Sequence, residues 1–256
     1  MSWLKRLIKD LLGKFGIFIM KFPSSGIYAE SGMATIHNAD CLKKPEFKTA
    51  YVRGIKAAGF DYGIKWKTYI ACWAASQAVR AGKGDFVECG VNKGFISSVI
   101  MSYLDWNQLD RKFYLIDTFS GIYEEILSDE EKAAGYIVKN RMAIAKGDYV
   151  NSADEARKNF KEWARVQVIA GCVPQVLKEI PLDPVAFIHL DMNNITPEKA
   201  AAEFFWPRLI KNGLILLDDY AFVGYGLSKK GMDDFARSVG VEILSLPTGQ
   251  GILIKN

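Results

Sequence analysis

The sequence predicts an α/β fold in which a mostly parallel sheet is preceded by a helical cap and closed by a C-terminal antiparallel hairpin. Five short runs rich in β-branched and aromatic residues alternate with amphipathic stretches, which is typical of βαβ units. Two further runs near the C-terminus are separated by three residues only. Such a connection is too short for a crossover, so these two runs must pair as a hairpin.

The predicted elements follow one another in a regular order. The first long helix is expected to end at Gly82 and Gly84, which stop the helical pattern. A single closing antiparallel strand is typical of the Rossmann-like sheet of class I methyltransferases, whereas a dehydrogenase sheet usually ends in a further parallel strand. We therefore divide the chain into an N-terminal helical cap, residues 1–82, and an α/β domain, residues 83–256. The helix is expected over 46–81, the parallel strands over 85–90, 112–117, 166–171, 185–191 and 213–219, and the hairpin over 241–247 and 251–256.

Composition excludes several classes of protein. The chain has 256 residues, half of them hydrophobic, which is enough for one large domain or one domain with an appendage. Its net charge is only +4 and its basic residues are scattered, so we expect no nucleic-acid partner. The cysteines lack metal-site spacing and favour reduced packing residues in a cytoplasmic protein. They are Cys41, Cys72, Cys89 and Cys172.

The N-terminal stretch "MSWLKRLIKDLLGKFGIFIMKFP" predicts an amphipathic helix. Charges interrupt it too often for a signal peptide or a membrane span. Such a helix packs on its own domain or on a second subunit of a homo-oligomer, or residues 1–20 make a peripheral contact with an anionic membrane. Packing is the favoured interpretation. The apolar positions are Leu4, Leu7, Ile8, Leu11, Leu12, Phe15 and Phe18.

The end of the first parallel strand carries a glycine-containing turn, "ECGVNKGFISS". Glycines let the backbone approach a ligand, and the free N–H groups of the following helix favour anionic or carboxylate groups. A turn of this kind also serves strand–helix packing alone. Glu88 would disfavour a pyrophosphate but suits the ammonium group of an amino-acid moiety. The candidate cofactor-binding residues are Glu88, Gly90, Val91, Asn92 and Gly94.

The next two strand ends complete a candidate adenosyl site. Asp117 ends the second strand, where an acidic residue can hold ribose hydroxyls. Thr118 follows it, and Phe119 could lie against a purine. Gly171 and Cys172 end the third strand and could line the adenine side, although a tight turn before a helix explains Cys172 equally well. Together with Glu88, these positions favour S-adenosylmethionine over a nicotinamide dinucleotide.

Acidic residues end the fourth and fifth strands, which are normally neighbours in this sheet. Asp191 can therefore approach Asp218 and Asp219, and three carboxylates suit Mg²⁺ or another hard divalent cation. Adjacent strand residues normally point to opposite faces, so one of the two adjacent aspartates could instead cap a helix or pair with a lysine. His189 shares the parity of Asp191. It is a candidate base or orienting residue, or a hydrogen-bonded core histidine.

These motifs resemble, in order and spacing, those of the macrocin O-methyltransferase family of metal-dependent sugar O-methyltransferases. The resemblance covers residues 83–256 and includes "GDFVECGVNKGFISS", "YLIDTFSGI", "IAGCVPQVL", "HLDMNN" and "FFWPRLIKNGLILLDDY". It implies S-adenosylmethionine as methyl donor, a sugar hydroxyl as acceptor, and Mg²⁺ held at the three aspartates. The match also carries the donor-binding role to Glu88, Gly90, Gly94 and Asp117. The chain departs from many methyltransferases at Asn92 and Phe95, where glycines are common.

The functional hypothesis is Mg²⁺-assisted O-methylation of a sugar or polyol hydroxyl in a small molecule. Its candidate catalytic residues are Asp191 and His189, and its candidate metal ligands are Asp191, Asp218 and Asp219. A nicotinamide-dependent reductase is the alternative enzyme, opposed by Glu88, a missing third glycine and the closing hairpin. A non-catalytic scaffold or membrane-surface protein that keeps the fold is the alternative outside enzymology.

Overall fold

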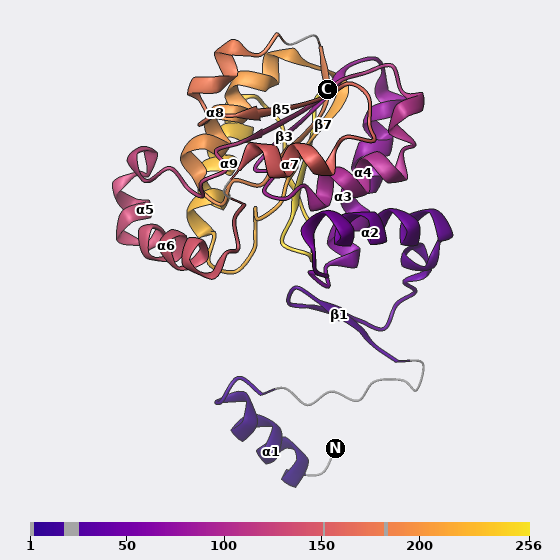
Figure 1. The fold of residues 1–256 in the computed structure, drawn as a ribbon. Helices are drawn as coiled ribbons and strands as arrows, with labels where there is room; N and C mark the ends of the chain where they lie inside the picture. The colour runs from indigo at the N-terminus through magenta and orange to yellow at the C-terminus, as the bar shows by residue number, and fades with distance from the viewer. Residues whose placement is uncertain (1–2, 18–25, 151, 182–183) are drawn as a thin grey trace.

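A seven-stranded sheet forms the centre of the protein in a computed structural model that describes residues 3–17, 26–150, 152–181 and 184–256. Its strands lie in the order β5-β4-β3-β6-β7-β9-β8 (Figure 1). The first five of these are parallel, β9 is antiparallel to β7, and β8 is antiparallel to β9. The predicted fold class is confirmed. The strands are β3 (Asp85–Cys89), β4 (Phe113–Asp117), β5 (Val166–Ala170), β6 (Val185–Leu190), β7 (Leu209–Leu217), β8 (Leu244–Ser245) and β9 (Gly251–Ile254).

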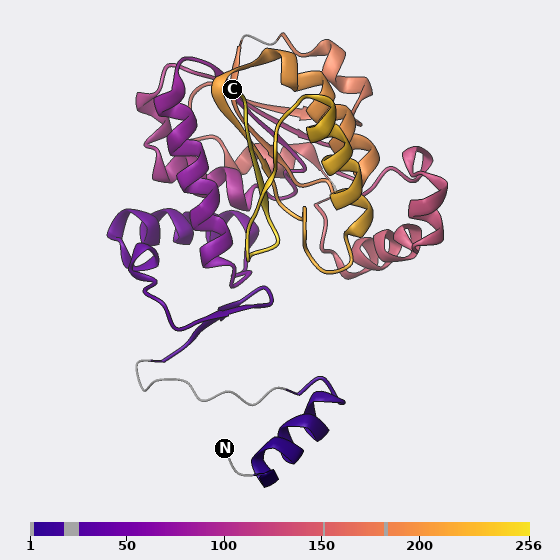
Figure 2. The ribbon, with the colours of Figure 1, turned by 180° about the vertical axis from the view of Figure 1, so that it is seen from behind.

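Helices cover both faces of this sheet. Figure 1 shows α2, α3 and α4 on one side and α8 and α9 on the other, and Figure 2 shows the same two layers from behind. The helices are α1 (Trp3–Gly13), α2 (Pro45–Ala58), α3 (Lys65–Ala81), α4 (Phe95–Tyr103), α5 (Asp129–Ala133), α6 (Tyr136–Lys146), α7 (Ala153–Asn159), α8 (Ile195–Phe205) and α9 (Gly226–Ser238). Short 3₁₀ helices are η1 (Asp40–Lys43), η2 (Trp106–Gln108), η3 (Glu124–Ile126), η4 (Gln175–Glu179) and η5 (Trp206–Arg208).

Strand alternation divides the buried residues into two hydrophobic clusters. Phe86, Phe187 and Leu216 face α2, α3 and α4, whereas Val87 and Ile188 face α8 and α9. Both clusters are built from near-continuous apolar runs, as expected for strands buried on two faces. The same alternation determines which side chains reach the site. At the strand ends, residues that share the parity of Phe86, Phe187 and Leu216 point toward α3.

The N-terminal region is more elaborate than the sequence predicted. The single helix expected over 46–81 is two helices, since Gly59 adopts a left-handed φ of 84° and caps α2. The segment before α2, for which we predicted no helix or strand, contains a hairpin of β1 (Tyr28–Glu30) and β2 (Met33–Thr35). Helices α2 and α3 share the core with the sheet. The cap is thus one of its two helical layers, and a domain boundary at residue 82 stays a prediction.

The structure also bears on the predictions made for the N-terminal segment and for the cysteines. The amphipathic N-terminal segment forms α1, which ends at Gly13, and Phe18 lies outside the described residues. In the described part of the chain, no helix has both the length and the apolar character needed to cross a membrane. All four cysteines are free, and Cys72 and Cys89 are buried, as predicted for packing residues.

Candidate active site

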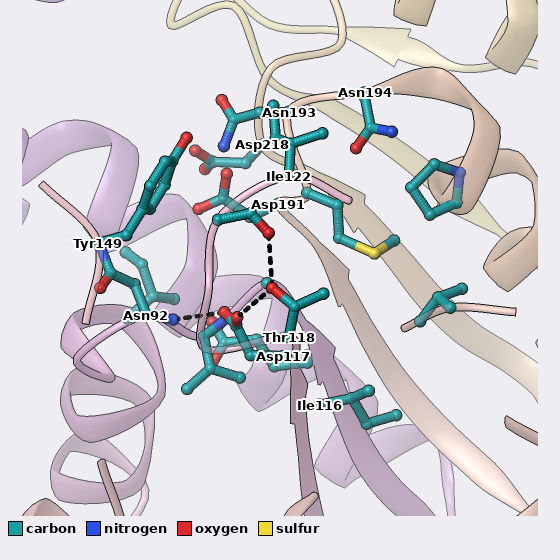
Figure 3. Close-up of a pocket in the computed structure, with 18 of the residues that line it drawn as sticks. Asn92, Ile116, Asp117, Thr118, Ile122, Tyr149, Asp191, Asn193, Asn194 and Asp218 are labelled. Atoms are coloured by element: carbon teal, nitrogen blue, oxygen red, sulfur yellow. Dashed lines mark hydrogen bonds between the residues drawn. The ribbon is translucent and has the colours of Figure 1, made fainter. Parts of the chain in front are cut away.

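A cavity of about 370 Å³ opens at the carboxyl ends of β3, β4, β6 and β7. This is where ligands bind in open α/β sheets, and the volume lies in the usual range for small-molecule sites. Its wall includes Glu88, Asp117, Asp191 and Asp218, which the sequence had singled out. Figure 3 shows the carboxylates of Asp191 and Asp218 together at one end of the cavity, with Tyr149 on the same side.

A buried polar chain links three neighbouring strands beneath the cavity. Glu88 on β3 and His189 on β6 are register partners, and Glu88 Oε1 lies 2.8 Å from His189 Nδ1. His189 Nε2 lies 3.6 Å from Asp218 Oδ1, just beyond the end of β7. The second oxygen of Glu88 and His189 Nε2 are buried without a hydrogen-bond partner among the residues that the structure describes. Unsatisfied buried polar atoms are costly, so these two atoms require a partner such as water, an ion or a ligand.

The two adjacent aspartates share one ammonium group. Lys67 Nζ lies 2.7 Å from Asp218 Oδ2 and 3.0 Å from Asp219 Oδ1, and it stands 5.3 Å from the centre of the Phe222 ring. Adjacent strand residues would point to opposite faces, but β7 ends at Leu217, so alternation no longer separates the two carboxylates. The pairing of one aspartate with a lysine, left open from the sequence, occurs for both.

The helix that carries Lys67 is held in place by the β1–β2 hairpin. Glu30 Oε1 accepts a hydrogen bond from the backbone N–H of Lys67, and Glu30 Oε2 accepts one from Trp66. These groups belong to the first turn of α3, where N–H groups lack partners within the helix and favour a carboxylate. The hairpin and α3 together therefore position the ammonium group of Lys67 over the ends of the strands.

The electrostatics of the site leave it with excess negative charge. Burial, reinforced by Asp218 and Asp219, raises the pKa of Asp191 well above its ordinary value. Burial opposes ionisation of Asp218 too, but Lys67 and His189 outweigh it and hold the pKa of that carboxyl low. Burial disfavours protonated His189, yet the nearby carboxylates of Asp218 and Glu88 raise its pKa to about 10. Four carboxylates thus face two basic side chains.

The donor atoms suit a divalent cation, although not in the set predicted. Within the described ranges, His189, Asp191 and Asp218 offer ligand atoms that all lie within 4.8 Å of one another. Asp219 is not in this group and contacts Lys67 instead. The excess of acidic side chains fits a cation at this point, and His189 would bind it through Nε2 after releasing the proton that its raised pKa places there. Direct ligation by Asp219 stays a prediction.

The glycine turn after β3 is shaped mainly by packing. Gly90 has a φ of 91°, and a Cβ there would lie 1.9 Å from the carbonyl oxygen of Asp191. Asp117 Oδ2 accepts the backbone N–H groups of Val91 and Asn92, and its Oδ1 accepts that of Phe119. The carboxylate that the sequence assigned to ribose thus also anchors the turn. Asp117 lines the cavity, so a ribose role stays a prediction.

The side chain of Asn92 makes two hydrogen bonds that the sequence did not predict. The residue adopts a left-handed φ of 49°, donates from Nδ2 to the carbonyl of Asp148, and accepts the N–H of Val150. These two bonds hold the loop on which Tyr149 reaches the cavity. Asn92 therefore connects the turn after β3 to the segment between β4 and β5.

Of the remaining candidates, some line the cavity and others do not. Thr118, Gly171 and Cys172 line the cavity, and the Thr118 hydroxyl donates to the carbonyl of Gly121. Gly94 lies nearby, where a Cβ would come within 2.2 Å of the Phe160 ring. Phe119 is buried in the core beside α4 and does not appear in the cavity wall, so a purine contact has no support in this arrangement.

Sequence reasoning missed the cavity residues that lie outside the strand ends. The cap contributes Ser31, Tyr62, Ile64 and Lys67, and the segment after β4 contributes Ile122, Tyr123 and Tyr149. No local motif marks these residues, because only tertiary packing brings them to the cavity. The one available signal was the adjacent pair of aspartates, which requires a nearby cation.

Glu198 gives the region a pH-dependent stability. Burial, then repulsion from Asp219, raises its pKa from 4.5 to about 8. Between these values the folded state binds a proton that the unfolded chain has lost, so stability falls as pH rises through this window. We expect Glu198→Gln to raise Tm by roughly 5 °C at pH 9 and to change it little at pH 5, in thermal scans. Glu203→Gln, at an exposed position of α8, is the control, and an equal shift at both pH values would contradict this assignment.

Comparison with known proteins identifies sequences similar to this protein. A sequence profile described as "Methyltransferase domain" matches residues 87–220. The demethyldecarbamoylnovobiocin O-methyltransferase of Streptomyces niveus is 26% identical over 144 residues, or 54% of this chain and 53% of that protein. The 8-demethyl-8-(2,3-dimethoxy-alpha-L-rhamnosyl)-tetracenomycin-C 4'-O-methyltransferase of Streptomyces olivaceus is 27% identical over 148 residues, with the same shares. The chain spans about half the length of these curated relatives.

Solved structures share the fold. The O-methyltransferase NovP superposes with a TM-score of 0.63 at 19% identity, covering 85% of this chain and 97% of that one. The calicheamicin methyltransferase CalS11 gives 0.51 at 17% identity, covering 86% and 94%. The profile match spans more than half of the chain and includes the ends of β3, β4, β6 and β7. The protein therefore belongs to the methyltransferase domain family.

Proposed function

We propose that this protein transfers a methyl group from S-adenosylmethionine to a hydroxyl of a sugar-containing small molecule, with help from Mg²⁺ or another hard divalent cation. The observation that carries the proposal is one cavity with two features in its wall. One is Glu88 beside a glycine turn, whose second carboxylate oxygen has no partner among the described residues, and the other is a cluster of acidic groups suited to a cation. The family match does not support the alternative of a nicotinamide-dependent reductase.

The donor half of the proposal rests on Glu88 and the turn after β3. The free oxygen of Glu88 is a buried acceptor that the ammonium group of the methionine moiety would satisfy. Asp117 lies at the end of the next strand, where its remaining lone pairs can accept ribose hydroxyls. Gly171 and Cys172 lie farther along the same edge, on the side proposed for adenine.

The acceptor half rests on the carboxylate cluster. Asp191 and Asp218, with His189, would hold the cation, which lowers the pKa of a hydroxyl bound to it. Lys67 keeps the Asp218 and Asp219 carboxylates oriented toward one another. Asp191 lies in this cluster at the cavity wall, and it is the proposed acceptor of the hydroxyl proton.

A sugar-containing acceptor is proposed from two sources. The relatives described above are named for methylation of novobiocin and tetracenomycin compounds, CalS11 is named for calicheamicin, and one of these names includes a rhamnosyl group. The motifs also resemble the macrocin O-methyltransferases. In this protein, Tyr62, Tyr123 and Tyr149 surround the cavity and offer both ring faces and hydroxyls, which suits a polyol.

The proposal is tested by incubating labelled S-adenosylmethionine with a panel of glycosides and nucleotide sugars, with and without EDTA. We expect methyl transfer to at least one sugar hydroxyl, lost on metal removal and restored by Mg²⁺. Transfer that persists after complete metal removal would reject the cation but keep the reaction class. Absence of transfer to every glycoside, together with transfer to catechols or other phenols, would reject the acceptor class.

A further inference from the structure

The N-terminal helix α1 presents an apolar face that the rest of the chain leaves exposed. Trp3, Leu7 and Leu11 are spaced by four residues, so they form one row along the helix. They are 76%, 51% and 56% exposed, and Ile8 beside them is 46% exposed. Both ribbon views show α1 apart from the α/β body (Figures 1 and 2). The interpretation favoured from the sequence was packing on its own domain or on a second subunit. The described residues do not show the first of these, and the second stays a prediction.

The polar face of α1 is basic. The segment from Trp3 to Ile17 contains Lys5, Arg6, Lys9 and Lys14 against one acidic residue, Asp10. Arg6 and Lys9 are three residues apart and lie on the side opposite to the Trp3 row. A helix with an apolar row on one face and cations on the other can bury the row in the headgroup region while its cations meet anionic lipids.

We propose that α1 binds the surface of an anionic lipid bilayer and so tethers this protein to a membrane. Charge decides between a bilayer and a second copy of the chain as the occupant. Packing the apolar row of α1 against a second α1 would leave both basic faces without a partner, whereas an anionic surface would neutralise them. The helix is also too short and too charged to cross the bilayer, which leaves a position in the interface plane.

The experiment is co-flotation of the full chain with vesicles of phosphatidylcholine alone and of phosphatidylcholine with phosphatidylglycerol. We expect binding to the anionic vesicles only, weakened by high salt. Arg6→Gln with Lys9→Gln should weaken binding about fivefold for each charge removed. Leu7→Asp with Leu11→Asp should abolish it. Lys158→Gln with Lys161→Gln removes the same charge from an exposed part of the body and should have little effect.

Two results would overturn the proposal. One is failure of the wild-type chain to bind anionic vesicles, or binding that the α1 variants do not change. The other is self-association, measured by light scattering, that Leu7→Asp with Leu11→Asp abolishes while vesicle binding is absent, because α1 would then be a subunit contact. Unchanged thermal unfolding of each variant shows that the body is intact. Vesicle binding is measured without catalysis, so its outcome is independent of the proposed methyl transfer.

Discussion

Asp191→Asn should lower the rate of methyl transfer by about 10²- to 10⁴-fold, the usual effect of losing a catalytic acid or base. Asp191 lines the cavity beside Asp218 and His189, so its carboxylate is placed to accept a proton or to hold the cation there. The amide cannot take the proton, and it is a poorer ligand for a cation. Binding of S-adenosylmethionine should change by less than about threefold, because the donor is proposed to lie against Glu88 and Asp117. Single-turnover kinetics and calorimetry separate the two effects.

The matched control is Asp148→Asn, which removes an exposed aspartate outside the cavity wall. It should keep near wild-type turnover. The role of Asp191 would be refuted by an Asp191→Asn enzyme that retains turnover within about fivefold of wild type. A parallel loss of donor binding would instead place Asp191 in the donor site.

Lys67→Met should destabilise the protein by about 3–5 kcal/mol when no divalent cation is present, because it leaves two buried carboxylates without their shared counter-charge. Asp218 and Asp219 both lie within 3.0 Å of the Lys67 ammonium in the native protein. Added Mg²⁺ should restore much of the loss and should bind the variant more tightly than wild type, since the ammonium no longer repels it. Urea unfolding with and without Mg²⁺ measures the first effect, and calorimetric titration of the metal measures the second.

Lys65→Met is the control for this change. Lys65 is exposed in the same first turn of α3, so its loss should alter neither stability nor metal affinity appreciably. If Lys67→Met is as stable as wild type in EDTA and shows no response to Mg²⁺, then the ammonium is not the counter-charge of the aspartate pair. The proposed metal site would then lose its main electrostatic support.

The sequence predicted the parts of the protein that local patterns control. Apolar runs placed all five parallel strands within a few residues, except that β7 begins at Leu209 rather than near Gly213. Strand ends then located Glu88, Asp117, Asp191 and Asp218, because parallel strands present their carboxyl ends at one edge. The break between α2 and α3 depends on Gly59, a single left-handed residue within an otherwise helical pattern.

What the sequence did not predict depends on contacts between distant segments. Lys67 reaches Asp219 across 152 residues of chain, and no periodicity in α3 marks it among the other lysines. Asn92 accepts a hydrogen bond from the backbone N–H of Val150, 58 residues away in the sequence. Many methyltransferases have a glycine at this position, whereas here the asparagine side chain anchors the Tyr149 loop. The predicted purine contact of Phe119 gains no support for a related reason, since the residue adopts a left-handed φ of 51° and its ring lies in the core.

The central claim is that the cavity is a site for S-adenosylmethionine, and calorimetric titration of the purified protein tests it most directly. The account predicts saturable binding of S-adenosylmethionine and of its demethylated product, S-adenosylhomocysteine, at one site per chain, with no detectable binding of NAD or NADP. Saturable binding of a nicotinamide dinucleotide, with none of either adenosyl compound, would contradict it.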